Sequence, residues 1–137
     1  MKLVTTIPAL PGHDIERAVT FYHDKLGFEC AHKDDSFARL VRDAVEIHLW
    51  AACDTHWKFR SIILFVRPVS SGAESFLGGT ASCTIKVEEI DKLYDECKKA
   101  GVLFGRDTIV EETSWGTREF PVLDPHRNLL TFYQSKH

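Results

Sequence analysis

The sequence predicts an α+β fold made of two tandem β-α-β-β-β modules within a single domain. Two amphipathic helical segments support this: each follows an extended stretch, ends at a glycine and precedes alternating strand-like runs. The chain has 137 residues, and a domain of this size buries roughly two-thirds of its unfolded surface. We expect module one at residues 1–53, a connecting segment at 54–81 and module two at 82–137. An α+β sandwich with two unrelated helices is the alternative.

Module one begins with an extended stretch from Leu3 to Leu10 that ends at Pro11-Gly12. A helix follows, with Asp14 as its predicted N-cap and Gly27 as its C-cap, residue types preferred at those positions. Its apolar stripe is Ile15, Ala18, Val19, Tyr22 and Leu26. Period-two alternation then predicts three strands, with a hairpin turn at Arg42-Asp43: Phe28–His32, Phe37–Arg42 and Val45–Trp50.

Module two repeats this order. The strand Ser82–Val87 leads through Glu88-Glu89 into a helix that ends at Gly101. The helix carries its apolar stripe at Ile90, Leu93, Tyr94 and Cys97. Three strands are expected after it, with a turn at 124–128: Val102–Arg106, Glu119–Leu123 and Leu129–Gln134. In the connecting segment, Ile62–Val66 could form an additional strand, and the Gly/Ser-rich stretch Ser70–Thr80 is a lid or, as we favour, a linker.

Composition excludes several classes of partner. The net charge of −3 and the lack of any Lys/Arg run argue against nucleic acid. No apolar run approaches the ~20 residues that cross a bilayer, and no signal sequence is recognisable at the N-terminus. The four cysteines show no CxxC spacing, which argues against a zinc knuckle or a redox motif. We therefore expect a cytoplasmic protein with reduced thiols.

Several motifs stand out along the chain. They are Ile7–Leu10 leading into Asp14–Tyr22, then Leu26-Gly27-Phe28, the hairpin Asp34–Asp43, and Trp115-Gly116 followed by Arg118-Glu119-Phe120, where this sequence inserts Thr117. Together they resemble the vicinal oxygen chelate superfamily and, within it, the bleomycin resistance proteins. The resemblance covers most of the chain except residues 54–79. It implies a curled, cup-shaped mixed sheet with the helices outside. It also implies a homodimer, often with exchanged modules, and ligand crevices at the interface.

Enzymes of this superfamily, such as glyoxalase I, hold one divalent ion with His, Gln or Glu from four inward strand positions. By resemblance, Thr5–Ile7, Ser82 and Thr131 stand at three of these positions, and hydroxyls are poor ligands. His48 is the only plausible ligand, so we expect no metal, no cofactor and no catalytic residue. The other histidines are expected to be solvated on turns or helix surfaces: His13, His23, His32, His56, His126 and His137.

Strand alternation predicts which side chains line the cup. Glu46, His48 and Trp50 share one face of their strand, while aliphatic residues occupy the other and should meet the helices. By the same alternation, Ser82 and Thr131 point inward.

Aromatic and charged residues outside these strands complete the predicted site. Trp57, Phe59 and Trp115 lie in loop-like segments that could rim the opening. Phe37 resembles the family's hairpin aromatic beside the ligand groove. Arg118 and Glu119 could bind polar groups of a ligand or pair with each other. Aromatic rings suit a small planar ligand, which could be cationic.

The leading hypothesis is a non-catalytic protein that binds and sequesters a bleomycin-type drug, and so confers antibiotic resistance. A metal-dependent lyase, isomerase or thiol transferase of the glyoxalase type is the first alternative, in which His48 acts with ligands that we have misplaced. A binding module for another metabolite is the second.

Overall fold

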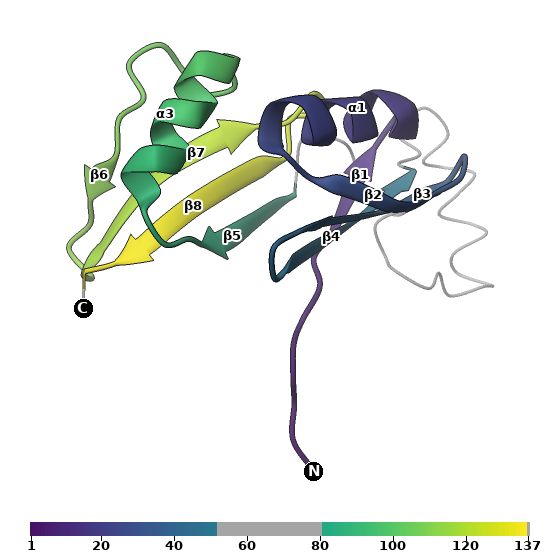
Figure 1. The fold of residues 1–137 in the computed structure, drawn as a ribbon, viewed down its shortest axis with the longest axis horizontal. Coiled ribbons are helices and arrows are strands. Elements are labelled where there is room, and N and C mark those ends of the chain that lie inside the picture. The colour runs from purple at the N-terminus through teal and green to yellow at the C-terminus, as the bar shows by residue number, and fades with distance from the viewer. Residues whose placement is uncertain (52–80, 137) are drawn as a thin grey trace.

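The structure is a computed structural model that describes residues 1–51 and 81–136. Each half contributes one four-stranded mixed sheet and one helix (Figure 1). The first half contains β1 (Ala9–Gly12), α1 (Ile15–Leu26), β2 (Glu29–Lys33), β3 (Phe37–Arg42) and β4 (Val45–Ala51). The second contains β5 (Ser82–Lys86), α3 (Ile90–Ala100), β6 (Glu111–Glu112), β7 (Thr117–Leu123) and β8 (Leu129–Ser135). The predicted α+β class and the tandem β-α-β-β-β order are confirmed.

The two sheets share one topology. Their strand orders are β1-β4-β3-β2 and β5-β8-β7-β6. The first strand of each half runs parallel to the last (β1 with β4, β5 with β8), and the remaining neighbours are antiparallel. A helix packs on one face of each sheet, and within residues 1–51 and 81–136 no helix of the same half covers the second face. None of the helices in the described ranges is long and apolar enough to span a bilayer.

Helix α1 has the ends and the buried stripe that its sequence predicts. The Asp14 side chain accepts a hydrogen bond from the Arg17 backbone N–H at 3.1 Å, which satisfies one of the free donors of the first turn. Gly27 ends the helix with φ 71°, a left-handed conformation that favours glycine. The predicted stripe is buried throughout: Ile15, Ala18, Val19, Tyr22 and Leu26.

Helix α3 begins differently. Glu89, at its N-cap, makes no side-chain capping bond, and the Ile90 N–H instead donates to Gln134 Oε1 of β8 at 2.9 Å. Asp91 in the first turn accepts two hydrogen bonds from Arg118 of β7, at 2.8 and 2.9 Å. The start of α3 is therefore held by its own sheet, and Gly101 ends the helix at φ 73°.

The aliphatic side of each sheet meets its helix. On β4, Ile47 and Leu49 are fully buried, whereas Glu46, His48 and Trp50 are half-buried on the opposite face. On β8, Leu130 and Phe132 are buried and Thr131 is half-buried. The predicted alternation is confirmed on both strands.

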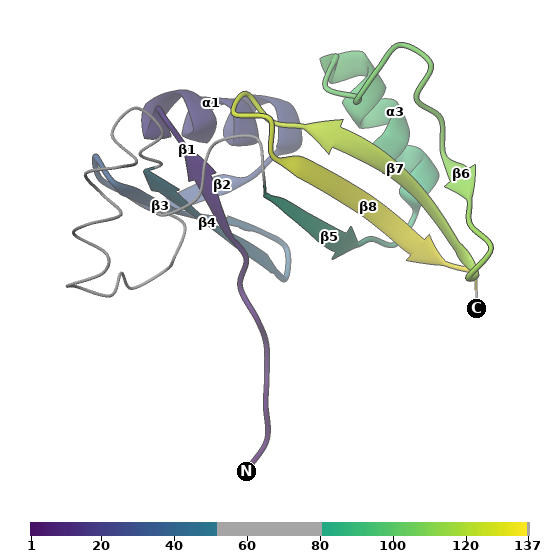
Figure 2. The same ribbon diagram turned by 180° about the vertical axis from the view of Figure 1, so that it is seen from behind.

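Two predicted strands differ from the structure. The expected strand Val102–Arg106 is wrong: only Leu103 forms an isolated bridge, with Val122, and the edge strand of the second sheet is β6. Val102 is buried directly after the helix, whereas Phe104 is 57% exposed. The apolar side chain of Phe104 therefore does not pack against the core as a strand residue would. The first strand lies later than expected, at Ala9–Gly12, and the residues before it extend away from both sheets (Figures 1 and 2). The features predicted at 62–66 and 70–80 lie outside the described residues.

The β7–β8 turn joins the two halves through buried polar contacts. Asp124 Oδ2 accepts a hydrogen bond from the Tyr22 hydroxyl of α1 at 2.9 Å, and Asn128 Nδ2 donates to the Pro11 carbonyl at 2.8 Å. His126 Nε2 accepts the Asp14 backbone N–H at 3.1 Å. We call Tyr22, Asp124, His126 and Asn128 the junction cluster. The expectation that His126 is solvated is wrong: it is 8% exposed, because this turn packs against the first half.

Candidate functional site

The uncovered face of the first sheet brings together aromatic and charged side chains from β3 and β4. Phe37 is opposite Trp50, and Arg39 is opposite His48, in the antiparallel register. The Phe37 ring centroid lies 4.6 Å from that of Trp50 and 5.0 Å from that of His48, the latter pair edge to face. These half-buried rings offer flat apolar area that a planar ligand can cover. We call this surface the open face.

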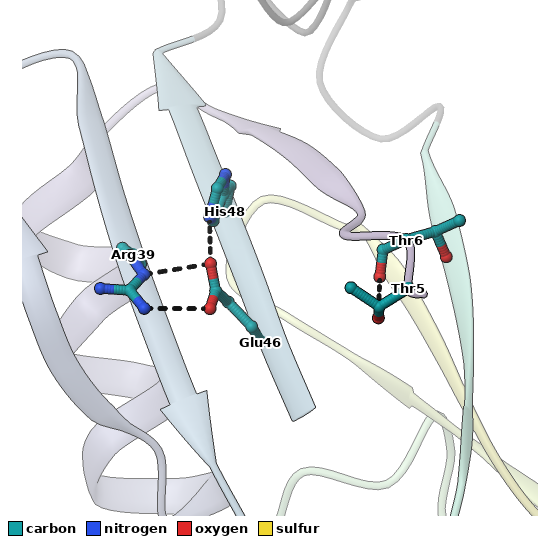
Figure 3. Close-up of polar contacts among 5 residues, drawn as sticks. All are labelled: Thr5, Thr6, Arg39, Glu46 and His48. Atoms are coloured by element: carbon teal, nitrogen blue, oxygen red, sulfur yellow. Dashed lines mark hydrogen bonds and ion pairs between the residues drawn. The ribbon is translucent and has the colours of Figure 1, made fainter. Parts of the chain in front are cut away.

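An ion-paired network lies on the open face (Figure 3). The Arg39 guanidinium donates from Nε to Glu46 Oε2 at 3.0 Å and from Nη2 to Glu46 Oε1 at 3.2 Å. Glu46 Oε2 also lies 2.6 Å from His48 Nε2. The hydrogen bonds from Arg39, and then that from His48, hold the pKa of the Glu46 carboxyl below its usual value. We call Arg39, Glu46 and His48 the open-face cluster.

Arg39 was not among the residues predicted from the sequence. The hairpin turn predicted at Arg42-Asp43 gives the register that places Arg39 opposite His48. That register, together with the predicted face of β4, is the sequence signal that points to Arg39. Asp43 takes a positive φ of 53° in the turn, which short polar side chains tolerate better than most.

The donor set of the open face does not fit a divalent metal ion. Within residues 1–51 and 81–136, no three His, Cys, Asp or Glu side chains lie close enough to hold one. Glu46 Oε2 already interacts with two nitrogens. The Thr5 hydroxyl donates to the Thr6 carbonyl at 3.4 Å and stands apart from the open-face cluster (Figure 3). Hydroxyls are weak ligands beside carboxylate and imidazole.

The second sheet contributes polar side chains on its uncovered face. Ser82 is exposed on β5, and Thr131 of β8 is half-buried beside Thr84 and Pro121. Glu119 Oε2 accepts a hydrogen bond from the Thr117 hydroxyl at 3.0 Å. This face is therefore polar, with hydroxyls at the positions predicted to point inward.

Arg118 lies apart from that group. It pairs with Asp91 of α3, and hence sits on the helix-covered face, whereas its neighbour Glu119 lies on the other face. The two side chains thus do not pair with each other, and Arg118 serves the attachment of α3.

Among the predicted aromatics that the structure describes, Trp115 is the most exposed. It is 71% exposed in the turn between β6 and β7, where Thr113 and Thr117 exchange hydrogen bonds. Trp57 and Phe59, the other predicted rim residues, lie outside the described residues.

Two thiols are unsuited to nucleophilic chemistry. Burial raises the pKa of Cys97 to about 12 and that of Cys83 to about 11. Both therefore stay protonated near neutral pH, and a thiol is a far weaker nucleophile than a thiolate.

A groove of about 690 Å³ lies elsewhere, between α3, β5 and the β3–β4 turn. Its floor includes Phe28 and Phe132, and its rim carries side chains of both charges. Arg42, on the rim, is already bonded to the Leu26 carbonyl at 2.6 Å and to Glu96 at 3.2 Å. The groove contains none of the predicted site residues and shows no preference for one ligand charge.

The fold and the open face define the class of protein. The chain belongs to the Glyoxalase/Bleomycin resistance protein/Dioxygenase superfamily, whose sequence profile matches residues 5–132. It is 47% identical over 132 residues to a bleomycin resistance protein of Geobacillus stearothermophilus, covering 96% of this chain and 97% of that one. A bleomycin resistance protein of Staphylococcus aureus matches to the same extent.

Solved structures agree with this assignment. The bleomycin-binding protein of the bleomycin producer Streptomyces verticillus, in complex with copper(II)-bleomycin, is 28% identical with a TM-score of 0.72, over 96% of each chain. A lactoylglutathione lyase of Agrobacterium tumefaciens has the same TM-score at 15% identity, covering 99% of this chain and 96% of that one. At that identity the lyase shares the fold alone.

Proposed function

We propose that this protein binds a bleomycin-type drug on its open face and confers resistance by sequestering it without chemical change. Two observations support this: the half-buried rings of Phe37, His48 and Trp50 on one surface, and the 47% identity to bleomycin resistance proteins. Such a surface binds by stacking and desolvation, and drug that is bound cannot reach its target. We place this activity in the cytoplasm.

The ligand we propose is planar in the part that meets the open face. Phe37 and Trp50 supply ring faces that also attract cationic groups. Glu46 supplies less attraction for a cation than its charge suggests, because the Arg39 guanidinium already neutralises it. Stacking area is therefore the larger contribution, and positive charge on the ligand the smaller.

We also propose that the protein is a homodimer and that the two halves of each chain act as one domain. Apolar side chains before β1 are exposed, with Leu3 at 90% and Val4 at 85%. Trp115 is exposed as well. Contiguous exposed apolar surface is typical of faces that another chain covers, and we infer that these side chains contribute to such a face in the dimer. A second copy would then bring its Trp115 to the rim of the crevice.

The decisive experiment measures binding and the fate of the drug together. Bleomycin added to the purified protein should quench Trp fluorescence saturably, at about one drug per chain, and the drug recovered afterwards should have an unchanged mass. Size-exclusion chromatography with light scattering should give the mass of a dimer. Absence of quenching would refute the proposal, and a chemically altered drug would favour an enzyme.

Trp115 provides a matched variant for this experiment. Trp115→Ala should weaken bleomycin binding by about 1–3 kcal/mol, the scale of an interface hot spot. The thermal unfolding midpoint should stay near that of the wild type, because the ring is largely exposed in the described chain. Unchanged affinity would remove Trp115 from the site.

A further inference from the structure

We propose that His48 selects the ligand by accepting a hydrogen bond at Nδ1 from an N–H group of the drug, such as an amide or an amino-substituted heteroaromatic ring. This inference rests on the proposed function and refines it. The inference adds a requirement to stacking on the open face: the ligand must carry a hydrogen-bond donor that reaches His48. It also assigns Arg39 a positioning role that acts through Glu46.

The first step concerns the charge of Glu46. Its carboxyl receives two hydrogen bonds from the Arg39 guanidinium, at 3.0 and 3.2 Å, and an arginine side chain stays protonated in proteins. This bidentate contact favours the ionised carboxylate. An ionised carboxylate accepts hydrogen bonds and donates none.

The second step assigns the proton on the imidazole. His48 Nε2 lies 2.6 Å from Glu46 Oε2, and because the carboxylate can only accept, Nε2 must carry the hydrogen. In the neutral ring, the lone pair is then on Nδ1. Arg39 therefore supports the tautomer of His48 indirectly, by holding the accepting Glu46 carboxylate in place beside Nε2.

The third step concerns the direction of Nδ1. The two ring nitrogens point in divergent directions, and the nitrogen away from Glu46 lies at the far edge of the ring (Figure 3). No residue of 1–51 or 81–136 makes a hydrogen bond to that nitrogen. The ring is held in place by Glu46 and by the edge-to-face contact with Phe37, at 5.0 Å and 88°. It thus presents a fixed acceptor beside the Phe37–Trp50 pair.

The chemical consequence is a combined requirement. A group that stacks on Phe37 and Trp50 while it directs an N–H toward His48 satisfies both features. A planar group without a donor leaves the acceptor unpaired once water is excluded, which sites built for a hydrogen bond reject strongly. Protonated His48 would itself donate at Nδ1 and would oppose the same N–H.

The test compares His48→Phe with His48→Asn. Phenylalanine keeps a ring against Phe37 but removes the acceptor, whereas asparagine loses the ring and keeps an acceptor oxygen at about the same distance from the backbone. With bleomycin titrated calorimetrically near pH 8, His48→Phe should bind about tenfold more weakly, as expected for one lost ligand hydrogen bond. His48→Asn should retain more affinity than His48→Phe.

Nuclear magnetic resonance of the imidazole separates an acceptor role from a packing role. Near pH 8 the nitrogen chemical shifts of the His48 ring should show the hydrogen on Nε2 and a lone pair on Nδ1, and the Nδ1 resonance should move when bleomycin binds. Arg39→Gln should broaden or split the ring resonances, because Glu46 loses the guanidinium that orients it, and Arg39→Lys should restore part of the wild-type pattern. A merely structural role for Arg39 would leave the His48 ring resonances unchanged.

The outcomes distinguish this inference from the function beneath it. If wild-type protein does not bind bleomycin, the proposed function fails and this inference fails with it. If the wild type binds and His48→Phe matches it in affinity, only the inference is overturned. If His48→Phe does not fold, a wild-type Nδ1 resonance that does not respond to bound bleomycin overturns the inference equally.

Discussion

The junction cluster and the open-face cluster contain similar polar residues in different surroundings. In the junction cluster, Asp124 accepts from the Tyr22 hydroxyl, from the Asn128 amide group and from two backbone N–H groups, those of His126 and Asn128. Asp124, His126 and Asn128 are all at most 8% exposed. In the open-face cluster, Arg39 is exposed and Glu46 and His48 are half-buried.

The two histidines carry their protons on opposite nitrogens. His126 Nε2 accepts the Asp14 N–H, so the neutral ring carries its hydrogen on Nδ1, which faces Gly12 in the interior. His48 Nε2 donates to Glu46, which leaves Nδ1 as the acceptor. Burial lowers the pKa of His126 and keeps it neutral. The comparison teaches that the group bonded to the ring and the burial around it, rather than the residue type, decide whether a histidine joins halves of a fold or stands on an open surface.

The largest expected effect is at Asp124. Asp124→Ala leaves four buried donors without their acceptor, which should lower the free energy of unfolding by about 3 kcal/mol or more. Chemical denaturation measures this loss. Asp95→Ala, on the exposed side of α3, is the matched control and should stay within about 0.5 kcal/mol of wild type. A loss below about 1 kcal/mol at Asp124 would show that the junction cluster does not join the halves.

Phe37→Ala should reduce ligand binding more than it reduces stability, the reverse of Asp124→Ala. Removal of the ring that contacts both Trp50 and His48 should weaken bleomycin binding by about 1–3 kcal/mol. Its effect on unfolding should be smaller than that of Asp124→Ala, because the ring is only half-buried. Calorimetric titration and denaturation of the same preparation compare the two. Equal losses in the free energies of binding and of unfolding would contradict the expectation that the open face serves binding more than stability.

His126 predicts a pH dependence of stability. Because its folded-state pKa is lowered by burial, the unfolded chain takes up the proton first. The free energy of unfolding should be highest above about pH 6.5, the ordinary value for histidine, and should fall as the pH drops below it. His126→Gln keeps an acceptor for the Asp14 N–H and should flatten this fall.

The charged groups around His126 do not reverse that sign. Asp124 and Asp14 favour the charged ring, His13 and Arg17 oppose it, and burial exceeds them all. His23, whose pKa is raised by its hydrogen bond with Asp24, acts in the opposite direction but is present in both proteins. The difference between wild type and His126→Gln therefore isolates His126. Parallel curves would assign the pH dependence to other groups.

Arg39→Ala should have the smallest effect on stability. Its side chain is 48% exposed, and solvent-exposed ion pairs contribute about 0–1 kcal/mol. Thermal unfolding should therefore move by no more than a few degrees. A loss as large as that at Asp124 would mean that the open-face cluster also holds the fold together.

The sequence was sufficient for the elements whose signals are local. The N-cap Asp14, the glycines that end both helices and the alternation along β4 depend on residues a few positions apart. The segment after α3 was harder, since Val102–Arg106 has strand-like composition but touches β7 only through the Leu103–Val122 bridge and the bond from the Phe104 N–H to the Pro121 carbonyl. Strand propensity measures how well a residue fits a pleated surface, and this segment lies along β7 for too short a distance to form a strand.

The sequence by itself therefore determined the two repeated modules, their buried stripes and the face that carries Glu46, His48 and Trp50. Tertiary structure decided the partners of polar side chains that lie far apart in the sequence: Asp91 for Arg118, and the first half of the chain for His126. Helical and strand periods fix which way a side chain points within its own element. Which group it meets depends on how elements far apart in sequence pack, and that packing also sets the burial of His126.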